Sequence, residues 1–99
     1  ATGQRPHFCP GGPKEVRKVG VITGGAGSEI FDIAATGIDT FITGEGPHWS
    51  YTAAEELGIN VIYAGHYATE TFGVKALAAR WCNENPGLSW EFFDHPTGL

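Results

Sequence analysis

The chain has 99 residues, of which 41% are apolar and 17% charged, and its formal net charge is −5. This length suits one domain, and the composition is too apolar for a disordered chain. Only six lysine and arginine residues are present, and four of them precede the first strong apolar run: Arg5, Lys14, Arg17 and Lys18. This argues against a nucleic-acid-binding surface, which needs many cations to neutralise phosphates.

The ends of the chain carry few signals of targeting or export. No apolar stretch reaches the roughly 18 residues that span a bilayer, and no charged-then-apolar segment opens the chain. Cys9 and Cys82 lie far apart and form no CxxC pair, so a cytoplasmic protein with unpaired thiols is expected. Residues 1–13 are rich in proline and glycine and are expected to be a tail or a linker remnant, with residues 14–99 forming the single domain.

Glycines and prolines divide the first half of the domain into alternating elements. Residues 16–23 predict a strand that enters a core, and a glycine-rich turn ends it. Ser28 is expected to cap a helix that stops at Gly37. Residues 39–43 predict a second strand, and residues 47–57 predict a helix closed by Gly58.

The second half continues the alternation. Residues 59–64 predict a third strand, a helix follows from His66 to about residues 83–87, and residues 88–93 predict a last strand. That helix is expected to bury Val74, Leu77, Ala78 and Trp81, and the other large aromatics are interpreted as core: Trp49, Trp90, Phe92 and Phe93. The order β-α-β-α-β-α-β predicts an α/β fold, a layered sheet with helices packed on it.

His66 and Glu70 stand four residues apart where a strand leads into a helix. Side chains at i and i+4 converge if the helix begins at His66, and the helix N-terminus is expected to keep the ring neutral, the form that binds metals. An imidazole and a carboxylate aimed together make half of a metal site. A solvated hydrogen-bonded pair would show the same spacing, so spacing alone leaves both interpretations open.

A complete metal site needs more ligands than this pair. The chain's own candidates are His7, His48, His95, Glu45 and Asp94. Glu45 and His48 follow the end of a strand and would lie near His66 if the strands are parallel neighbours. His7 falls in the expected tail, and His95 could merely cap the last strand.

A second candidate site is the glycine-rich turn. Gly24, Gly25, Gly27 and Ser28 lie between a strand and a helix, where backbone N–H groups can bind an anion or phosphate. The turn lacks the ending of a P-loop and the spacing of a dinucleotide-binding motif. A tight turn that needs small residues is the simpler interpretation, and a nucleotide sensor without catalysis is a third.

Four segments in this order resemble one known family. Gly65-His66-Tyr67-Ala68-Thr69-Glu70 is the most distinctive, and three others accompany it: residues 23–28 (TGGAGS), 41–45 (FITGE) and 96–99 (PTGL). Together they are similar to the C-terminal part of the Nif-three-like family, also called GTP cyclohydrolase I type 2 homologues. The resemblance covers about residues 14–99.

The resemblance implies one lobe of a two-lobe α/β protein with a dinuclear metal site between the lobes, in subunits that assemble into homo-oligomeric rings. His66 and Glu70 match the ligand pair of the C-terminal lobe. The adjacent histidine pair of the N-terminal lobe is absent, because Phe8 follows His7. The missing lobe, or a second polypeptide, is therefore the implied partner, and two divalent ions (zinc, manganese or iron) are the implied cofactors.

Two functions remain open on this basis. In the first, the complete protein is a metal-dependent hydrolase of a phosphate- or purine-containing substrate, with Glu45 as the proton shuttle. In the second, the lobe is a structural or partner-binding module in which the metal has no catalytic role.

Overall fold

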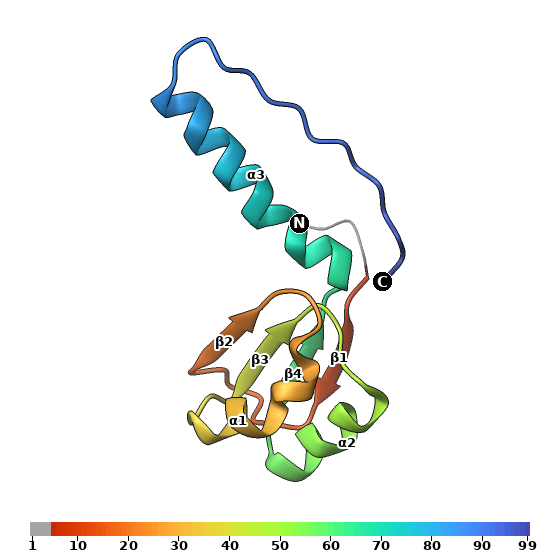
Figure 1. Ribbon diagram of the computed structural model, residues 1–99. Coiled ribbons are helices and arrows are strands. Elements are labelled where there is room, and N and C mark those ends of the chain that lie inside the picture. The colour runs from red at the N-terminus through yellow and green to blue at the C-terminus, as the bar shows by residue number, and fades with distance from the viewer. Residues whose placement is uncertain (1–4) are drawn as a thin grey trace.

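A four-stranded sheet with the order β1-β4-β3-β2 organises the computed structural model, which describes residues 5–99 (Figure 1). The strands are β1 (His7–Pro10), β2 (Val19–Ile22), β3 (Thr40–Thr43) and β4 (Asn60–Tyr63). The helices are the short 3-10 helix η1 (Ala26–Glu29), α1 (Ile30–Ala35), α2 (His48–Leu57) and α3 (His66–Glu84). The strands β2, β3 and β4 run parallel, and β1 pairs antiparallel with β4. The α/β class is confirmed.

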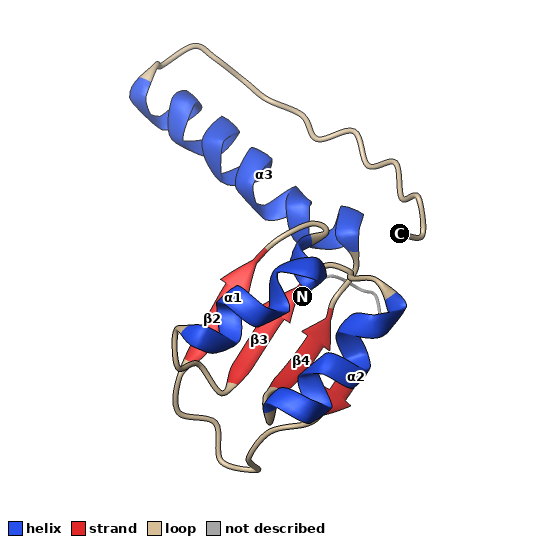
Figure 2. Ribbon diagram, turned by 60° about the horizontal axis from the view of Figure 1, so that its bottom comes forward, coloured by secondary structure: helices blue, strands red, loops and turns tan. Residues whose placement is uncertain are grey.

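The core lies between the sheet and the helices α1 and α2, which cover one of its faces (Figure 2). Cys9, Val61 and Phe41 stand side by side in the register of β1, β4 and β3, and each is fully buried. On the edge strand β2, Val19 and Val21 pair with Thr40 and Ile42, so they lie on the sheet face opposite Phe41, and both are exposed. The expectation that this strand enters the core is therefore wrong.

The proline- and glycine-rich start of the chain belongs to the fold from residue 7 onward. The expectation of a tail or linker over residues 1–13 is wrong for β1, which hydrogen-bonds along β4; residues 1–4 lie outside the described part. A Cβ on Gly11 would lie 2.5 Å from the Ile59 carbonyl oxygen, and one on Gly12 would lie 2.7 Å from the Asn60 amide nitrogen. These glycines permit close backbone packing, which composition alone does not distinguish from flexibility.

The third helix projects away from the sheet, and the C-terminal segment runs back beside it without regular structure (Figure 1). The predicted strand over residues 88–93 is wrong. The expected burial of α3 is wrong for Val74, Leu77 and Trp81, which are all more than half exposed. The other aromatics expected in the core are not buried either: Trp49, Trp90, Phe92 and Phe93. Helical periodicity identified this helix, but within residues 5–99 the apolar side chains of Val74, Leu77 and Trp81 stay largely uncovered.

Smaller differences concern the helix ends. Ser28 lies within η1 and caps no helix with its side chain, since α1 begins only at Ile30. The end of α2 agrees with the sequence, because Gly58 closes it at φ +72°, a left-handed conformation that favours glycine. No helix in residues 5–99 has the length and hydropathy to cross a membrane.

Asp39 fastens the start of β2 to the start of β3. Its Oδ2 accepts hydrogen bonds from the Arg17 and Lys18 amides, each at 2.9 Å, and its Oδ1 accepts one from the Thr40 hydroxyl at 2.8 Å. These donors lower the pKa of Asp39, with the Lys18 amide contributing most. The carboxylate is thus held in its ionised form.

Replacing Asp39 by asparagine is expected to lower the melting temperature at neutral pH. Because the folded-state pKa lies below the unfolded value of about 3.9, this stabilisation is complete above that value and disappears as pH falls through the folded-state pKa. Thermal unfolding of wild type and Asp39→Asn from pH 7 to pH 2 should show the two melting temperatures converging in acid. A difference that is constant with pH would contradict the ionic role.

Candidate metal centre

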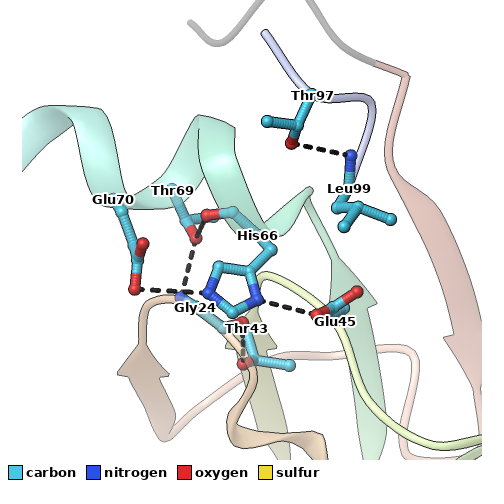
Figure 3. A network of polar contacts seen from close by, with 8 residues as sticks. All are labelled: Gly24, Thr43, Glu45, His66, Thr69, Glu70, Thr97 and Leu99. Atoms are coloured by element: carbon cyan, nitrogen blue, oxygen red, sulfur yellow. Dashed lines mark hydrogen bonds and ion pairs between the residues drawn. The ribbon is translucent and has the colours of Figure 1, made fainter. Parts of the chain in front are cut away.

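His66 is the first residue of α3, directly after Gly65, so the helix begins where the i, i+4 argument required it to begin. Its Nε2 lies 3.4 Å from Oε1 of Glu70 on the next turn of α3. The two side chains are partly exposed, at 37% and 57%. Figure 3 shows Glu70 on one side of the imidazole and Glu45 on the other.

Glu45 fixes the orientation of the ring. Its Oε1 lies 2.7 Å from Nδ1 of His66, on the opposite side of the ring from Glu70. A proton on Nδ1 donated to this carboxylate leaves Nε2 free to bind a metal, the usual arrangement of a ligating histidine and its carboxylate partner. Glu45 is therefore placed to position His66, whereas the sequence had suggested a proton shuttle.

The surroundings of His66 act against the sequence-based expectation of a neutral ring. The hydrogen bond with Glu45 raises the pKa of His66, and the charges of Glu70 and Glu45 act in the same direction. Partial desolvation opposes them but does not prevail. Both carboxylates thus favour the protonated ring, against the tendency expected of the helix N-terminus.

The turn at residues 24–28 packs against this centre. A Cβ on Gly24 would lie 2.7 Å from Oε1 of Glu70, and one on Gly25 would lie 3.4 Å from Cε1 of His66. Gly24 also has φ +74°, which favours glycine. Because glycine has no side chain, Gly24 and Gly25 leave room for the His66 imidazole and the Glu70 carboxylate. This favours the interpretation of the segment as a tight turn that needs small residues.

The amides of the same turn are partly used within the protein. The Gly24 amide donates to Thr69 Oγ1 at 2.9 Å, and the Gly27 amide donates to the Glu45 carbonyl at 3.0 Å. Of the remaining members, Gly25 precedes the four-residue 3-10 helix η1 and Ser28 lies within it. Two of the four expected anion-binding groups are thus committed to internal bonds, and the turn serves the centre structurally.

Thr69 is a contributor that the sequence analysis missed. It is buried on α3 between His66 and Glu70, donates to the His66 carbonyl at 3.1 Å, and accepts the Gly24 amide. It therefore ties the glycine turn to the helix that carries both candidate ligands. The sequence feature that could have identified Thr69 is its position between His66 and Glu70 in the His-x-x-x-Glu segment.

The other candidates for completing the site make contacts of their own. Asp94 accepts the Tyr67 hydroxyl at 2.8 Å, and the His95 amide donates to the same hydroxyl at 2.7 Å. His7 and His48 line a pocket that Glu45 also borders. Within residues 5–99 no group of three or more histidine, cysteine, aspartate or glutamate side chains has the arrangement to hold a metal ion.

Comparison with known proteins places this geometry in context. The chain is 47% identical over 98 residues to a protein of Deinococcus radiodurans named GTP cyclohydrolase 1 type 2 homolog, covering 99% of this chain and 37% of that protein. A relative of the same name in Escherichia coli is 42% identical over 95 residues, covering 95% of this chain and 38% of the relative. The chain thus spans less than two-fifths of the length of these relatives.

Solved structures show the same fold over nearly the whole chain. Protein ybgI, described as of unknown function, superposes with a TM-score of 0.89 at 40% identity, covering 99% of this chain and 40% of ybgI. TTHA1606 from Thermus thermophilus superposes with a TM-score of 0.86 at 47% identity, covering 99% of this chain and 39% of its own. Residues 2–97 match the family described as Duf34/NIF3 (NGG1p interacting factor 3). The chain belongs to the Duf34/NIF3 family.

Proposed function

We propose that this chain supplies His66 and Glu70 as metal ligands to a dinuclear site that a further part of a longer protein, or a second polypeptide, completes. The observation that carries the proposal is the imidazole held between two carboxylates, with Nδ1 on Glu45 and Nε2 facing Glu70. The short coverage of the relatives supports a partner lobe. Assembly into a homo-oligomer is part of the same proposal.

The residues present fit half of such a site. The Nε2 atom of His66 and Oε1 of Glu70 lie 3.4 Å apart, so one divalent ion can be bound by both. An imidazole nitrogen and a carboxylate oxygen suit zinc, manganese or iron(II). Since the described residues contain no group of three such ligands, the chain alone is expected to bind metal weakly.

The chemistry that follows is hydrolysis. In a completed site that His66 and Glu70 help to form, divalent ions would supply Lewis acidity and would lower the pKa of a bound water molecule. The chain's own contribution is positional: Glu45 orients His66, and the glycine turn with Thr69 holds α3 at the site.

Metal content after dialysis tests the proposal directly. The 99-residue chain and its His66→Ala and Glu70→Ala variants would be dialysed against zinc, manganese or iron(II) and measured by plasma mass spectrometry. His95→Ala is the matched control, since only the His95 backbone is hydrogen-bonded to Tyr67. Wild type and His95→Ala should carry more metal than the other two variants, even though binding by the chain alone is weak.

If the chain alone retains no metal, the comparison is repeated with a polypeptide that also carries a paired-histidine lobe. Retention that does not depend on His66 or Glu70 in that longer protein would overturn the proposal.

The alternative, a metal-binding structural or partner-binding module, is favoured by one observation. The row Val74, Leu77 and Trp81 is exposed along α3, as expected of a surface that packs against another protein. In that case, chelation should dissociate or destabilise the assembly without loss of any reaction. An assembly that keeps its size and melting temperature in chelator would exclude a structural metal.

A further inference from the structure

A pocket of about 560 Å³ opens beside the candidate metal centre. Its main walls come from segments that meet at one edge of the sheet, and they carry His7, Glu45, Pro47, His48, Tyr51 and Tyr63. Glu45 and Pro47 follow the end of β3, and Tyr63 ends β4. Ligand sites of parallel α/β sheets gather at this edge, and the volume lies within the range of about 300–1,000 Å³ typical of small-molecule sites.

One wall of the pocket is aromatic. The His7 ring lies 5.7 Å from the Tyr51 ring and 6.2 Å from the Tyr63 ring, tilted by 47° and 41°. The Tyr63 hydroxyl is 2.7 Å from Ser50 Oγ, which fixes the tyrosine ring in place. A Cβ on Gly46 would lie 3.2 Å from Tyr63 Cε1, so glycine keeps that side of the ring clear. Tilted rings held rigidly form a surface against which a flat ring packs well.

Among the described residues that line the pocket, Glu45 is the one carboxylate. Glu45 uses Oε1 to hold His66, while no hydrogen bond within residues 5–99 engages its Oε2. Within residues 5–99, no lysine or arginine lines the pocket. A phosphate group would find neither of these cations among the described wall residues, whereas an N–H donor would find a carboxylate oxygen.

We propose that this pocket binds a planar aromatic nitrogen heterocycle, packed against Tyr51 and Tyr63 and donating a ring N–H to Glu45. Because Glu45 also holds His66, the bound ring lies directly beside the metal ligands. The assignment rests on the proposed function for its role as a substrate site, and it adds the class of substrate: one with an uncharged heteroaromatic ring.

Benzimidazole and 1-methylbenzimidazole form a matched pair of probes, because methylation removes the N–H donor and keeps the ring. Dissociation constants for both would be measured at pH 8 on the 99-residue chain by ligand-observed saturation-transfer NMR titration. The methylated probe is expected to bind about tenfold more weakly, since it lacks a hydrogen bond to a charged acceptor. Equal dissociation constants for the two probes would overturn the proposed hydrogen bond from the ring N–H to Glu45.

The aromatic wall is tested by Tyr51→Leu, which should weaken benzimidazole binding by up to about tenfold. Phe72→Leu is the control, because Phe72 is an exposed aromatic on α3 outside the pocket. Equal losses in both variants would overturn the pocket as the binding site.

Metal content measured on the same samples separates the two proposals. Metal retained by Tyr51→Leu together with weakened ring binding supports both. If benzimidazole binds but the metal content does not depend on His66, the proposed metal site is overturned and the proposed ligand pocket stands. Metal binding through His66 without preference for the N–H probe overturns the ligand assignment alone.

Discussion

Glu45→Ala is expected to weaken divalent-metal binding by about 10- to 100-fold, the usual effect of removing the carboxylate partner of a ligating histidine. The Glu45 carboxylate accepts from His66 Nδ1 at 2.7 Å and thereby directs Nε2 toward Glu70. Without it, the imidazole can rotate and can place its proton on either nitrogen. Titration of zinc into wild type and variant, followed calorimetrically, measures the loss.

Glu45→Gln separates positioning from proton transfer. The amide oxygen can still accept from Nδ1, so metal affinity should stay within a few-fold of wild type. If Glu45 also transfers a proton, the glutamine variant of the complete protein would lose turnover while keeping its metal. Nitrogen-15 NMR of the His66 ring gives a readout independent of metal: the Nδ1–H form should dominate in wild type and decline in Glu45→Ala. An unchanged tautomer ratio would refute the positioning role.

Gly44→Ala is expected to reduce the free energy of unfolding by about 1–3 kcal/mol or more, because the new methyl group meets backbone that cannot move aside. A Cβ at this position would lie 2.7 Å from His66 Cα and 2.8 Å from the Gly65 carbonyl oxygen, and it would contact the Gly24 carbonyl oxygen more closely still. The same glycine accepts the Gly65 amide at 2.8 Å. The substitution therefore disturbs the junction of all three segments that form the candidate metal centre.

Gly73→Ala is the matched control for this prediction. Gly73 lies within α3, and a Cβ there would meet no heavy atom within 4 Å. Alanine in a helix interior is favoured over glycine by about 1 kcal/mol, so this variant should be neutral or stabilised. Urea unfolding of both variants gives the comparison. Equal stabilities would show that the junction at Gly44 can relax.

The two halves of the site depend on different parts of the chain. His66, Thr69 and Glu70 all come from the first turns of α3, so their arrangement follows from the helix itself. Glu45 and the glycine turn reach them through the parallel pairing of β2, β3 and β4. The pocket requires in addition that β1 pair with β4, which brings His7 opposite Tyr63.

The sequence by itself determined the class of fold and the local elements. Apolar periodicity and the glycines between segments located β2, β3, β4 and the helices, with differences of a few residues at their ends. The four-residue spacing of His66 and Glu70 was sufficient to place both side chains together, because a helix that starts at His66 fixes this geometry. These features depend on contacts between residues close in sequence.

Only the tertiary structure decided the rest. In the tertiary structure, residues 7–10 form an edge strand and the apolar side chains Val74, Leu77 and Trp81 of α3 are exposed. Glu45 is hydrogen-bonded to Nδ1 of His66. Each of these depends on which distant segments pair or pack together. A local pattern states that a helix has an apolar side or that a segment is rich in glycine. It does not state what covers that side, or that glycine is needed there because another backbone passes within van der Waals contact.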